Sequence, residues 1–264
     1  IQEFDGLHKF IGWNKVILTD SGGFQGWSIP NRFNNDGIEF KNIYDGSKFF
    51  MDPKLSMDIQ QTLNSDIAMI LDSLIDINKE YDEQLNAINT TQQWANIARN
   101  YHTNNNQSLF GIVQGGKHKE LREKSATDMM TIDFDGYAIG GLAIGETPEE
   151  RKEIVNFTVE MLPKDKLRYV MGLGDIEGML ELIELGVDIF DCVWPARLAR
   201  HGKIINKGKF LNLKNSKYKK DIDPLVVGCR CFVCLNFSKA YLRHLLTNEP
   251  TSAWFYLTLH NIIQ

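Results

Sequence analysis

Six short apolar runs, each ending at glycine or at a polar side chain, constrain the fold of this chain more than any other feature. They are Val16–Thr19, Ile67–Leu71, Phe110–Val113, Tyr137–Ile139, Tyr169–Met171 and Ile189–Phe190. Stretches of helical length and pattern lie between them. Strands of a parallel sheet are buried on both faces and read as unbroken apolar runs, so this alternation predicts parallel βα units.

Helices are predicted between the runs from apolar periodicity and from prolines in first turns. Their predicted ranges are 53–63, 80–101, 117–130, 148–161 and 176–185. The segment Asn31–Asp45 mixes Asn, Asp and Gly with isolated apolar residues, so it is expected to form a loop or a small hairpin. Asn104–Asn106 is expected to be a loop.

Six strands do not close an eight-stranded barrel. Either the sheet is open and doubly wound, or two βα units precede residue 1. The chain begins with Ile1 rather than methionine, which favours the second alternative. We therefore expect an α/β fold, a (β/α)8 TIM barrel with six of its eight strands in this chain.

Reactive side chains follow four of the runs. Asp20, Asp72 and Asp191 supply carboxylates, and Gln114 supplies a carboxamide. The active site of a (β/α)8 barrel lies at the carboxyl ends of its strands, so one pocket could hold all four. Simpler interpretations exist: Asp20 precedes Ser-Gly and could cap a turn, and Asp191 could be one more strand-end carboxylate.

Charge is distributed unevenly along the 264 residues, whose net charge is −5. Nine of the 29 Lys and Arg lie between Arg197 and Lys220, where there is no Asp or Glu, so the remainder carries −14. A basic stretch on an acidic protein is typical of a polyanion partner, although a solvated loop is the alternative. No run of about 18 or more apolar residues is present, so no membrane span is predicted.

Three of the four cysteines, Cys229, Cys231 and Cys234, form a C-x-C-x2-C cluster. Such spacing predicts a structural zinc site that needs a fourth ligand, and both His244 and His260 follow. The alternative is a disulfide, but three clustered cysteines cannot all pair and one bridge would close a very small loop. Cysteine use of this kind fits a reducing cytoplasm. We expect residues 1–202 to form the partial catalytic barrel and 203–264 a zinc-binding subdomain.

Five motifs occur in order along the chain. They are LTDSGGFQ at 18–25, FGIVQGG at 110–116, GGLAIGE at 140–146, YVMG at 169–172 and DIFDCVWP at 188–195. With the cysteine cluster and the ending Thr258–Asn261, they resemble the tRNA-guanine transglycosylase (queuine tRNA-ribosyltransferase) family, of bacterial type and truncated at both ends.

The resemblance implies a (β/α)8 barrel enzyme with a zinc-binding insertion near its C-terminus. It implies exchange of the wobble guanine of tRNAs with a GUN anticodon for a 7-deazaguanine base, preQ1 or queuine. The exchange belongs to queuosine biosynthesis and passes through a covalent aspartyl-tRNA intermediate. A cytoplasmic homodimer with one structural Zn²⁺ per chain is also implied.

The resemblance assigns roles by position. Asp191 corresponds to the nucleophile and Asp20 to the acid/base carboxylate. Arg197 and Arg200 correspond to tRNA-contacting arginines. The fourth zinc ligand corresponds to His260. The residues that correspond to the base-binding site are Asp20, Ser21, Gly22, Gly23, Phe24, Asp72, Gln114, Gly140, Gly141, Leu142 and Met171.

Several of these positions have a simpler interpretation. Phe24 and Met171 could be plain core, and Gln114–Gly116 could be a structural turn. Cys192, beside the implied nucleophile, has no evident histidine partner and is expected to be a packed thiol.

The chain departs from the family pattern at a few positions. Ser73 and Leu74 replace the Glu-Cys that usually follows the aspartate in bacterial relatives. A bulky Ile144 favours a small aminomethyl substituent on the incoming base, but Ser73 and Leu74 weaken that inference. Trp194 replaces a smaller apolar residue.

Three other functions compete with base exchange at the wobble position. One is a non-catalytic partner subunit that binds tRNA, against which the retained Asp20, Asp72 and Asp191 argue. The second is an unrelated α/β enzyme with an accessory zinc domain. The third is an archaeal-type enzyme acting elsewhere on tRNA.

Overall fold

The computed structural model of the chain describes residues 1–28, 31–42, 45–142 and 145–264. These residues form two compact units. The first comprises Ile1–Leu173 and Gly178–Phe190, and the second comprises Gly174–Glu177 and Asp191–Gln264. No helix in the described part of the chain is both long and apolar enough to cross a membrane.

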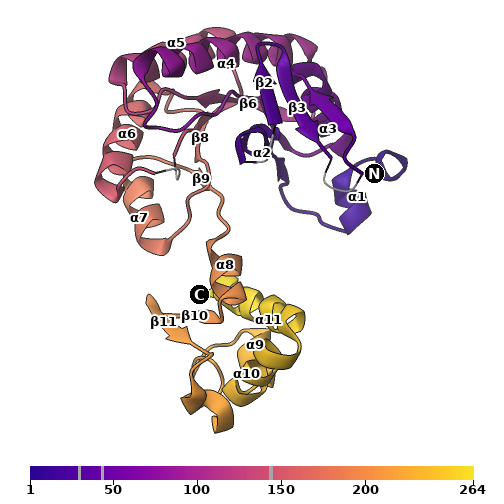
Figure 1. Ribbon diagram of the computed structural model, residues 1–264, viewed down its shortest axis with the longest axis vertical. Coiled ribbons are helices and arrows are strands. Elements are labelled where there is room, and N and C mark those ends of the chain that lie inside the picture. Colours follow the sequence, from indigo (N-terminus) through magenta and orange to yellow (C-terminus); the bar gives the residue numbers. More distant parts are fainter. Residues whose placement is uncertain (29–30, 43–44, 143–144) are drawn as a thin grey trace. The chain divides into compact units, whose positions relative to one another are not determined.

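The first unit is built on a six-stranded sheet in which every pair of neighbours is parallel. Its strand order follows the chain, and the sheet curls into half of a barrel (Figure 1). The strands are β1 (Leu18–Thr19), β5 (Ile67–Met69), β6 (Ser108–Val113), β7 (Gly136–Ile139), β8 (Leu167–Val170) and β9 (Ile189–Phe190). Each predicted apolar run therefore contributes one strand, and the predicted α/β fold with six parallel strands is confirmed.

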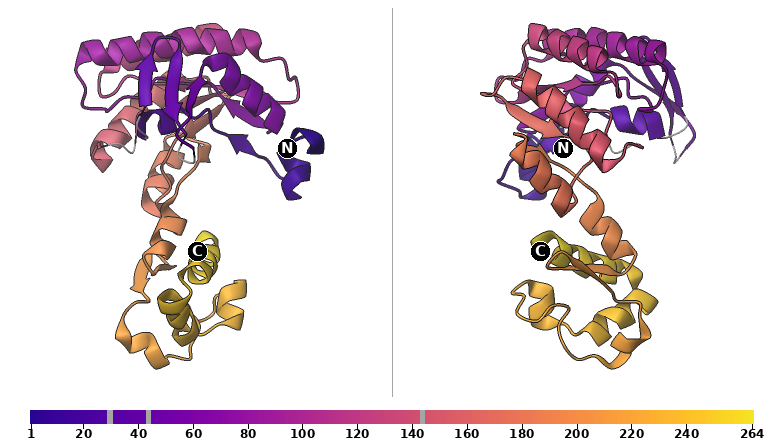
Figure 2. Two further views of the ribbon diagram at one scale, coloured as in Figure 1. Left: turned by 45° about the vertical axis from the view of Figure 1, so that its right-hand side comes forward. Right: turned by 90° about the vertical axis from the view of Figure 1, so that its left-hand side faces the viewer.

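Helices connect the strands and lie on the outer side of the curled sheet (Figures 1 and 2). They are α3 (Pro53–Leu63), α4 (Tyr81–Tyr101), α5 (Lys119–Ile132), α6 (Pro148–Met161) and α7 (Ile176–Glu184). Local chemistry fixes two of the starts. Asp52 accepts a hydrogen bond from the Leu55 amide at 2.7 Å ahead of α3, and Thr147 and Glu150 form a capping box ahead of α6.

The core of this unit lies between the sheet and those helices. Strand residues such as Ile112, Ala138 and Val170 are fully buried, as expected for a sheet covered on both faces. Apolar burial of this extent is the main favourable contribution to folding, at roughly 25 cal/mol per Å². It holds the carboxyl ends of the strands at fixed positions.

The first unit also contains an antiparallel sheet. The hairpin alternative for residues 31–45 is right, with strands β2 (Asn31–Asn34) and β3 (Gly37–Lys41), whereas a third strand beyond this range, β4 (Lys48–Met51), was not predicted. Its reason is long-range packing. Ile38 and Trp94 of α4 are buried together, and the Trp94 indole donates a hydrogen bond to the Asn35 carbonyl at 2.8 Å.

The first unit also contains a short 3-10 helix and two short helices, η1 (Gln2–Phe4), α1 (Leu7–Ile11) and α2 (Gly23–Ser28). The predicted loop at Asn104–Asn106 is confirmed, since it lies between α4 and β6.

The second unit has a core of its own, which includes Ile204, Leu242 and Leu257. Its elements are α8 (Trp194–Arg200), β10 (Lys203–Asn206), β11 (Lys209–Asn212), η2 (Ser216–Lys220), α9 (Phe232–Asn236), α10 (Lys239–Asn248) and α11 (Pro250–Ile263). Strands β10 and β11 form an antiparallel hairpin. Internal packing places α8 in this second unit. The predicted boundary after residue 202 refers to the extent of the catalytic barrel, and it stays a prediction.

Candidate active site and metal centre

The turn after β1 holds the first predicted site residues in place. One carboxylate oxygen of Asp20 accepts a hydrogen bond from the Ser21 amide at 2.8 Å, and the Ser21 hydroxyl accepts one from the Gly23 amide at 3.3 Å. The Ser56 hydroxyl of α3 donates to the Ser21 carbonyl at 3.0 Å. The turn is therefore fixed to the helix that follows it, with Asp20 at its start.

Asp72 is a buried carboxyl group, only 5% exposed, three residues after the end of β5. Burial, followed by the neighbouring charge of Asp20, raises its pKa to about 7, and the hydrogen bond from Gln114 acts in the opposite direction. A Cβ atom on Gly23 would collide with Oδ1 of Asp72. Glycine at this position therefore lets the turn after β1 approach the Asp72 carboxyl group.

Gln114 is a buried carboxamide that lies beside Asp72. Its Nε2 donates a hydrogen bond to Oδ2 of Asp72 at 2.6 Å, and both side chains are buried. A Cβ atom on Gly140 or on Gly141 would lie 2.7 Å from the Gln114 amide, so the amide lies against bare backbone. Gly141 has a φ of +69°, which glycine adopts most readily.

This arrangement can read the edge of a planar, hydrogen-bonding ligand. A carboxyl group, a carboxamide and glycine backbone offer donors and acceptors within one buried site. Leu142, 6% exposed, adds an apolar residue after the glycines. The structure thus brings Asp20, Asp72, Gln114 and the Gly140–Gly141 turn together within the first unit, and their roles stay a prediction.

Two other predicted base-binding residues, Phe24 and Met171, are less buried than Asp72 and Gln114. Phe24 is on α2 and about half exposed, and Met171 follows β8 directly, half-buried against the main core. Leu74 is buried, and the backbone amide of Ser73 donates to the Thr91 hydroxyl at 3.0 Å. Ile144 lies outside the described residues.

Asp191 and the two predicted tRNA-contacting arginines belong to the second unit. Asp191 follows the last residue of β9 in the chain, and Arg197 and Arg200 lie on α8 with exposed side chains. The thiol of Cys192 donates to the Gly174 carbonyl at 3.4 Å, which agrees with the expected packed thiol.

Sequence reasoning missed two buried polar residues of α5. The Ser125 hydroxyl accepts a hydrogen bond from the backbone N–H of Gln114 at 3.0 Å, and the Arg122 guanidinium donates to the carbonyl of Gly140 at 3.1 Å. The available signal was a polar pair spaced by three on the apolar stripe of this helix, which also carries Leu121, Ala126 and Met129.

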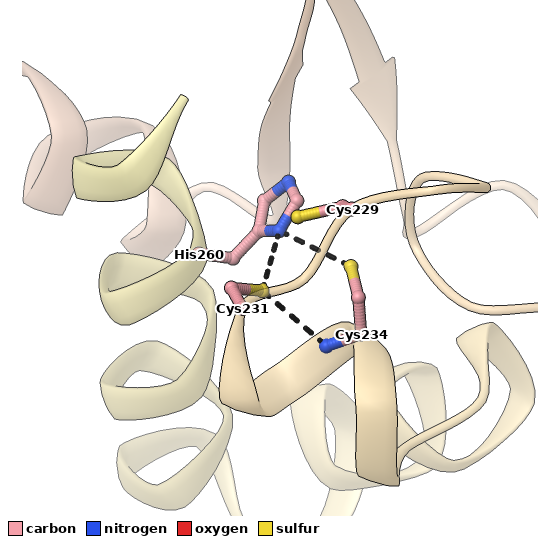
Figure 3. Close-up of side chains that lie close together, drawn as sticks. All are labelled: Cys229, Cys231, Cys234 and His260. Carbon is pink, nitrogen blue, oxygen red and sulfur yellow. Dashed lines mark hydrogen bonds between the residues drawn. The ribbon is translucent and has the colours of Figure 1, made fainter.

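Cys229, Cys231, Cys234 and His260 converge in the second unit (Figure 3). Their ligand atoms all lie within 4.8 Å of one another. Nδ1 of His260 lies 3.4 Å from the sulfur atoms of both Cys231 and Cys234. Nε2 of the same ring lies 3.0 Å from the Ile205 carbonyl, to which it donates. That hydrogen bond leaves the lone pair of Nδ1 directed at the sulfurs, the usual arrangement of a ligating histidine.

The chemistry of this cluster fits a divalent metal ion. Burial raises the pKa of the Cys234 thiol to about 12 and lowers the pKa of His260, so both groups are neutral in the protein alone. A bound cation instead stabilises thiolates, and three thiolates with one imidazole form a closed, structural set. His244 lies apart on α10, where Asn248 lies within hydrogen-bond distance of it at 3.2 Å.

The family profile and the three relatives that match this chain below all have the same name. The sequence profile of the family described as "Queuine tRNA-ribosyltransferase" matches residues 1–264. A protein of that name from Dictyoglomus turgidum is 43% identical over 267 residues, covering 99% of this chain and 69% of the relative. The Bacillus subtilis protein is 42% identical, covering 99% and 70% respectively. The Thermotoga neapolitana protein is 46% identical over 258 residues, covering 97% and 70%.

Proposed function

Because this chain belongs to the queuine tRNA-ribosyltransferase family, we propose that it is a tRNA-guanine transglycosylase, a pentosyltransferase that modifies tRNA. In this proposal the enzyme removes the wobble guanine of tRNAs with a GUN anticodon. It inserts a 7-deazaguanine base, preQ1 or queuine, in queuosine biosynthesis.

The buried Asp72–Gln114 pair is the observation that carries the proposal. Guanine and 7-deazaguanine present an N–H, an exocyclic amine and a carbonyl along one edge. A carboxylate accepts from the first two, and a carboxamide or a backbone amide donates to the carbonyl. The 2.6 Å hydrogen bond between the pair holds both groups ready before the base arrives.

Asp191 and Asp20 have the chemical roles in this proposal. An Asp191 oxygen attacks C1′ of the ribose, so that a C–O bond forms while the bond from C1′ to the guanine nitrogen breaks. Asp20 donates a proton to the departing guanine and then accepts one from the incoming base. The nitrogen of that base attacks C1′ and releases Asp191. The base is held between Phe24 and Met171, as extruded bases are commonly held.

The second unit supplies the proposed metal site and the contacts to tRNA. We take the metal to be one structural Zn²⁺ per chain, held by the Cys3His cluster; when bound, it fixes the fold of this unit. Arg197 and Arg200 contact tRNA, and seven lysines extend the basic surface along β10, β11, η2 and their connections. These are Lys203, Lys207, Lys209, Lys214, Lys217, Lys219 and Lys220.

We also propose a cytoplasmic homodimer. None of the four cysteines, all of which lie in the described part of the chain, forms a disulfide, which suits a reducing compartment. Exposed apolar side chains on the second unit, including Ile222 and Leu235, are the kind of surface that a second copy covers.

The covalent intermediate gives the sharpest test of the proposed chemistry. Wild-type protein incubated with unmodified tRNA is expected to form an adduct that survives a denaturing gel, whereas Asp191→Asn forms none. Cys192→Ser, at the neighbouring position, is the matched control and keeps the adduct. An adduct that persists in Asp191→Asn would refute the nucleophile assignment. Retention of Asp20, Asp72 and Asp191 favours this enzyme over a non-catalytic partner subunit.

A further inference from the structure

Arg122 is a cation buried inside the first unit, with 1% of its surface exposed. It lies in the first turn of α5, and its side chain reaches the carboxyl ends of β6 and β7. Nε donates to the Gly116 carbonyl at 3.0 Å. Nη1 donates to the carbonyls of Gly140 at 3.1 Å and Val113 at 3.4 Å.

These three carbonyls belong to residues close to Gln114, one of the predicted base-binding residues. Val113 and Gly116 flank Gln114 in the chain, and Gly140 packs against its amide. One guanidinium therefore links the loop after β6 to the turn after β7. Arg is suited to this task because its donors form a rigid planar fork.

Burying this cation costs free energy. Among the described residues, Nη2 of Arg122 has no hydrogen-bond partner. Burial lowers the Arg122 pKa to about 10, while the charge of Glu146 favours the protonated form, so the group remains charged at neutral pH. An apolar side chain would fill such a position at lower cost.

We propose that Arg122 is a positioning residue for base recognition, which sets the spacing between Gln114 and the Gly140–Gly141 turn. The inference rests on the proposed function, because Gln114 and the Gly140–Gly141 turn are base-binding residues of that proposal. Arg122 itself need not touch the base.

A second buried arginine in the same unit provides a matched control. Arg168, 7% exposed, also donates to three backbone carbonyls, those of Pro163, Gly186 and Leu162, each at 3.3 Å. It lies near the amino end of β8, whereas the predicted base-binding residues follow the carboxyl ends of the strands. Loss of Arg168 therefore removes a comparable set of hydrogen bonds without touching the base-binding residues.

The experiment compares Arg122→Met with Arg168→Met in the full-length protein, using guanine exchange into tRNA. Arg122→Met is expected to raise KM for guanine by about tenfold or more, the scale of a lost charge-assisted hydrogen bond, while KM for tRNA changes little. Arg168→Met should leave KM for guanine unchanged. If both variants change KM for guanine equally, or neither does, the inference is wrong.

Two further measurements keep the result independent of folding and of activity. Arg122→Lys keeps the charge but loses the fork, so it should share the guanine defect, and it replaces Arg122→Met should that variant not fold. Hydrogen exchange of the backbone amides at 113–116 and 140–142 should accelerate in the Arg122 variants and not in Arg168→Met. This second readout decides the inference even where the wild-type protein exchanges no guanine, an outcome that would refute the proposed function alone. Unchanged exchange at both segments would overturn the positioning role.

Discussion

At the scale of single residues, Asp72 shows how the fold changes the chemistry of an ordinary side chain. Burial and the charge of Asp20 disfavour its ionised form, and its pKa rises to about 7. The carboxyl group is therefore divided between its two protonation states near neutral pH. Groups with such shifts gather at functional sites, where a protein tolerates a local loss of stability.

The Asp72 carboxyl group should make the stability of the protein depend on pH. In the unfolded chain it loses its proton near pH 4, whereas in the folded protein it keeps the proton up to about pH 7. The folded state thus binds more protons than the unfolded chain in this range. The contribution of the Asp72 carboxyl group to stability is therefore present below about pH 4 and is lost as the pH rises to 7.

Asp72→Asn removes this dependence. Between pH 5 and pH 8, the free energy of unfolding of wild type should fall relative to that of Asp72→Asn by an amount on the order of a few kcal/mol. Base exchange should be lost in the variant. Urea unfolding at the two pH values measures the difference. Wild-type and variant stabilities that change in parallel with pH would contradict the assignment.

The sequence could locate the reactive side chains because they follow strands, but it could not locate what holds them. Asp20, Asp72 and Gln114 each end an apolar run, and the topology of a parallel sheet places such ends together. Arg122 has backbone carbonyls as partners, and those partners leave no mark in the sequence.

At the scale of elements, features that depend on local sequence could be predicted, whereas a strand that depends on long-range packing could not. The starts of α3 and α6 follow from Pro53 and Pro148 with their caps, and both agree with the predicted ranges. Strand β4 was missed because it forms only through pairing with β3, for example Ile38 with Met51, above the buried Trp94. Nothing within residues 48–51 specifies that pairing.

The Cys3His cluster connects α9 with α11, and its histidine also connects α11 with the strand β10. His260 of α11 contacts two of the cysteine sulfurs and also the Ile205 carbonyl of β10. A metal ion at this point would link residues 229–234 to α11, two segments that are separated in sequence, and a structural zinc ion contributes directly to folding.

His260→Ala should therefore release the metal and unfold the second unit, while His244→Ala should do neither. The loss is on the order of 10 kcal/mol of metal-binding free energy, enough to leave that unit unfolded at room temperature. Metal analysis together with circular dichroism measures both effects. Full metal content in a folded His260→Ala protein would show that the cluster is not the metal site.

At the scale of the whole molecule, the Asp72–Gln114 pair and the basic residues belong to different units. The first unit holds the Asp72–Gln114 pair, and the second holds Asp191, the metal cluster and all nine basic residues between Arg197 and Lys220. An overall charge of −5 conceals this division. A basic unit suits the phosphate backbone of a nucleic acid, whereas a buried polar pair suits a single base.

Transfer of labelled guanine into tRNA is the direct test of the proposed base exchange. The full-length protein would be incubated with radiolabelled guanine and an unmodified tRNA that carries guanine at the wobble position. We expect label to enter the tRNA, Asp191→Asn to prevent this, and an excess of a 7-deazaguanine to suppress it. An absence of label in a folded protein with its metal bound would refute the proposed exchange.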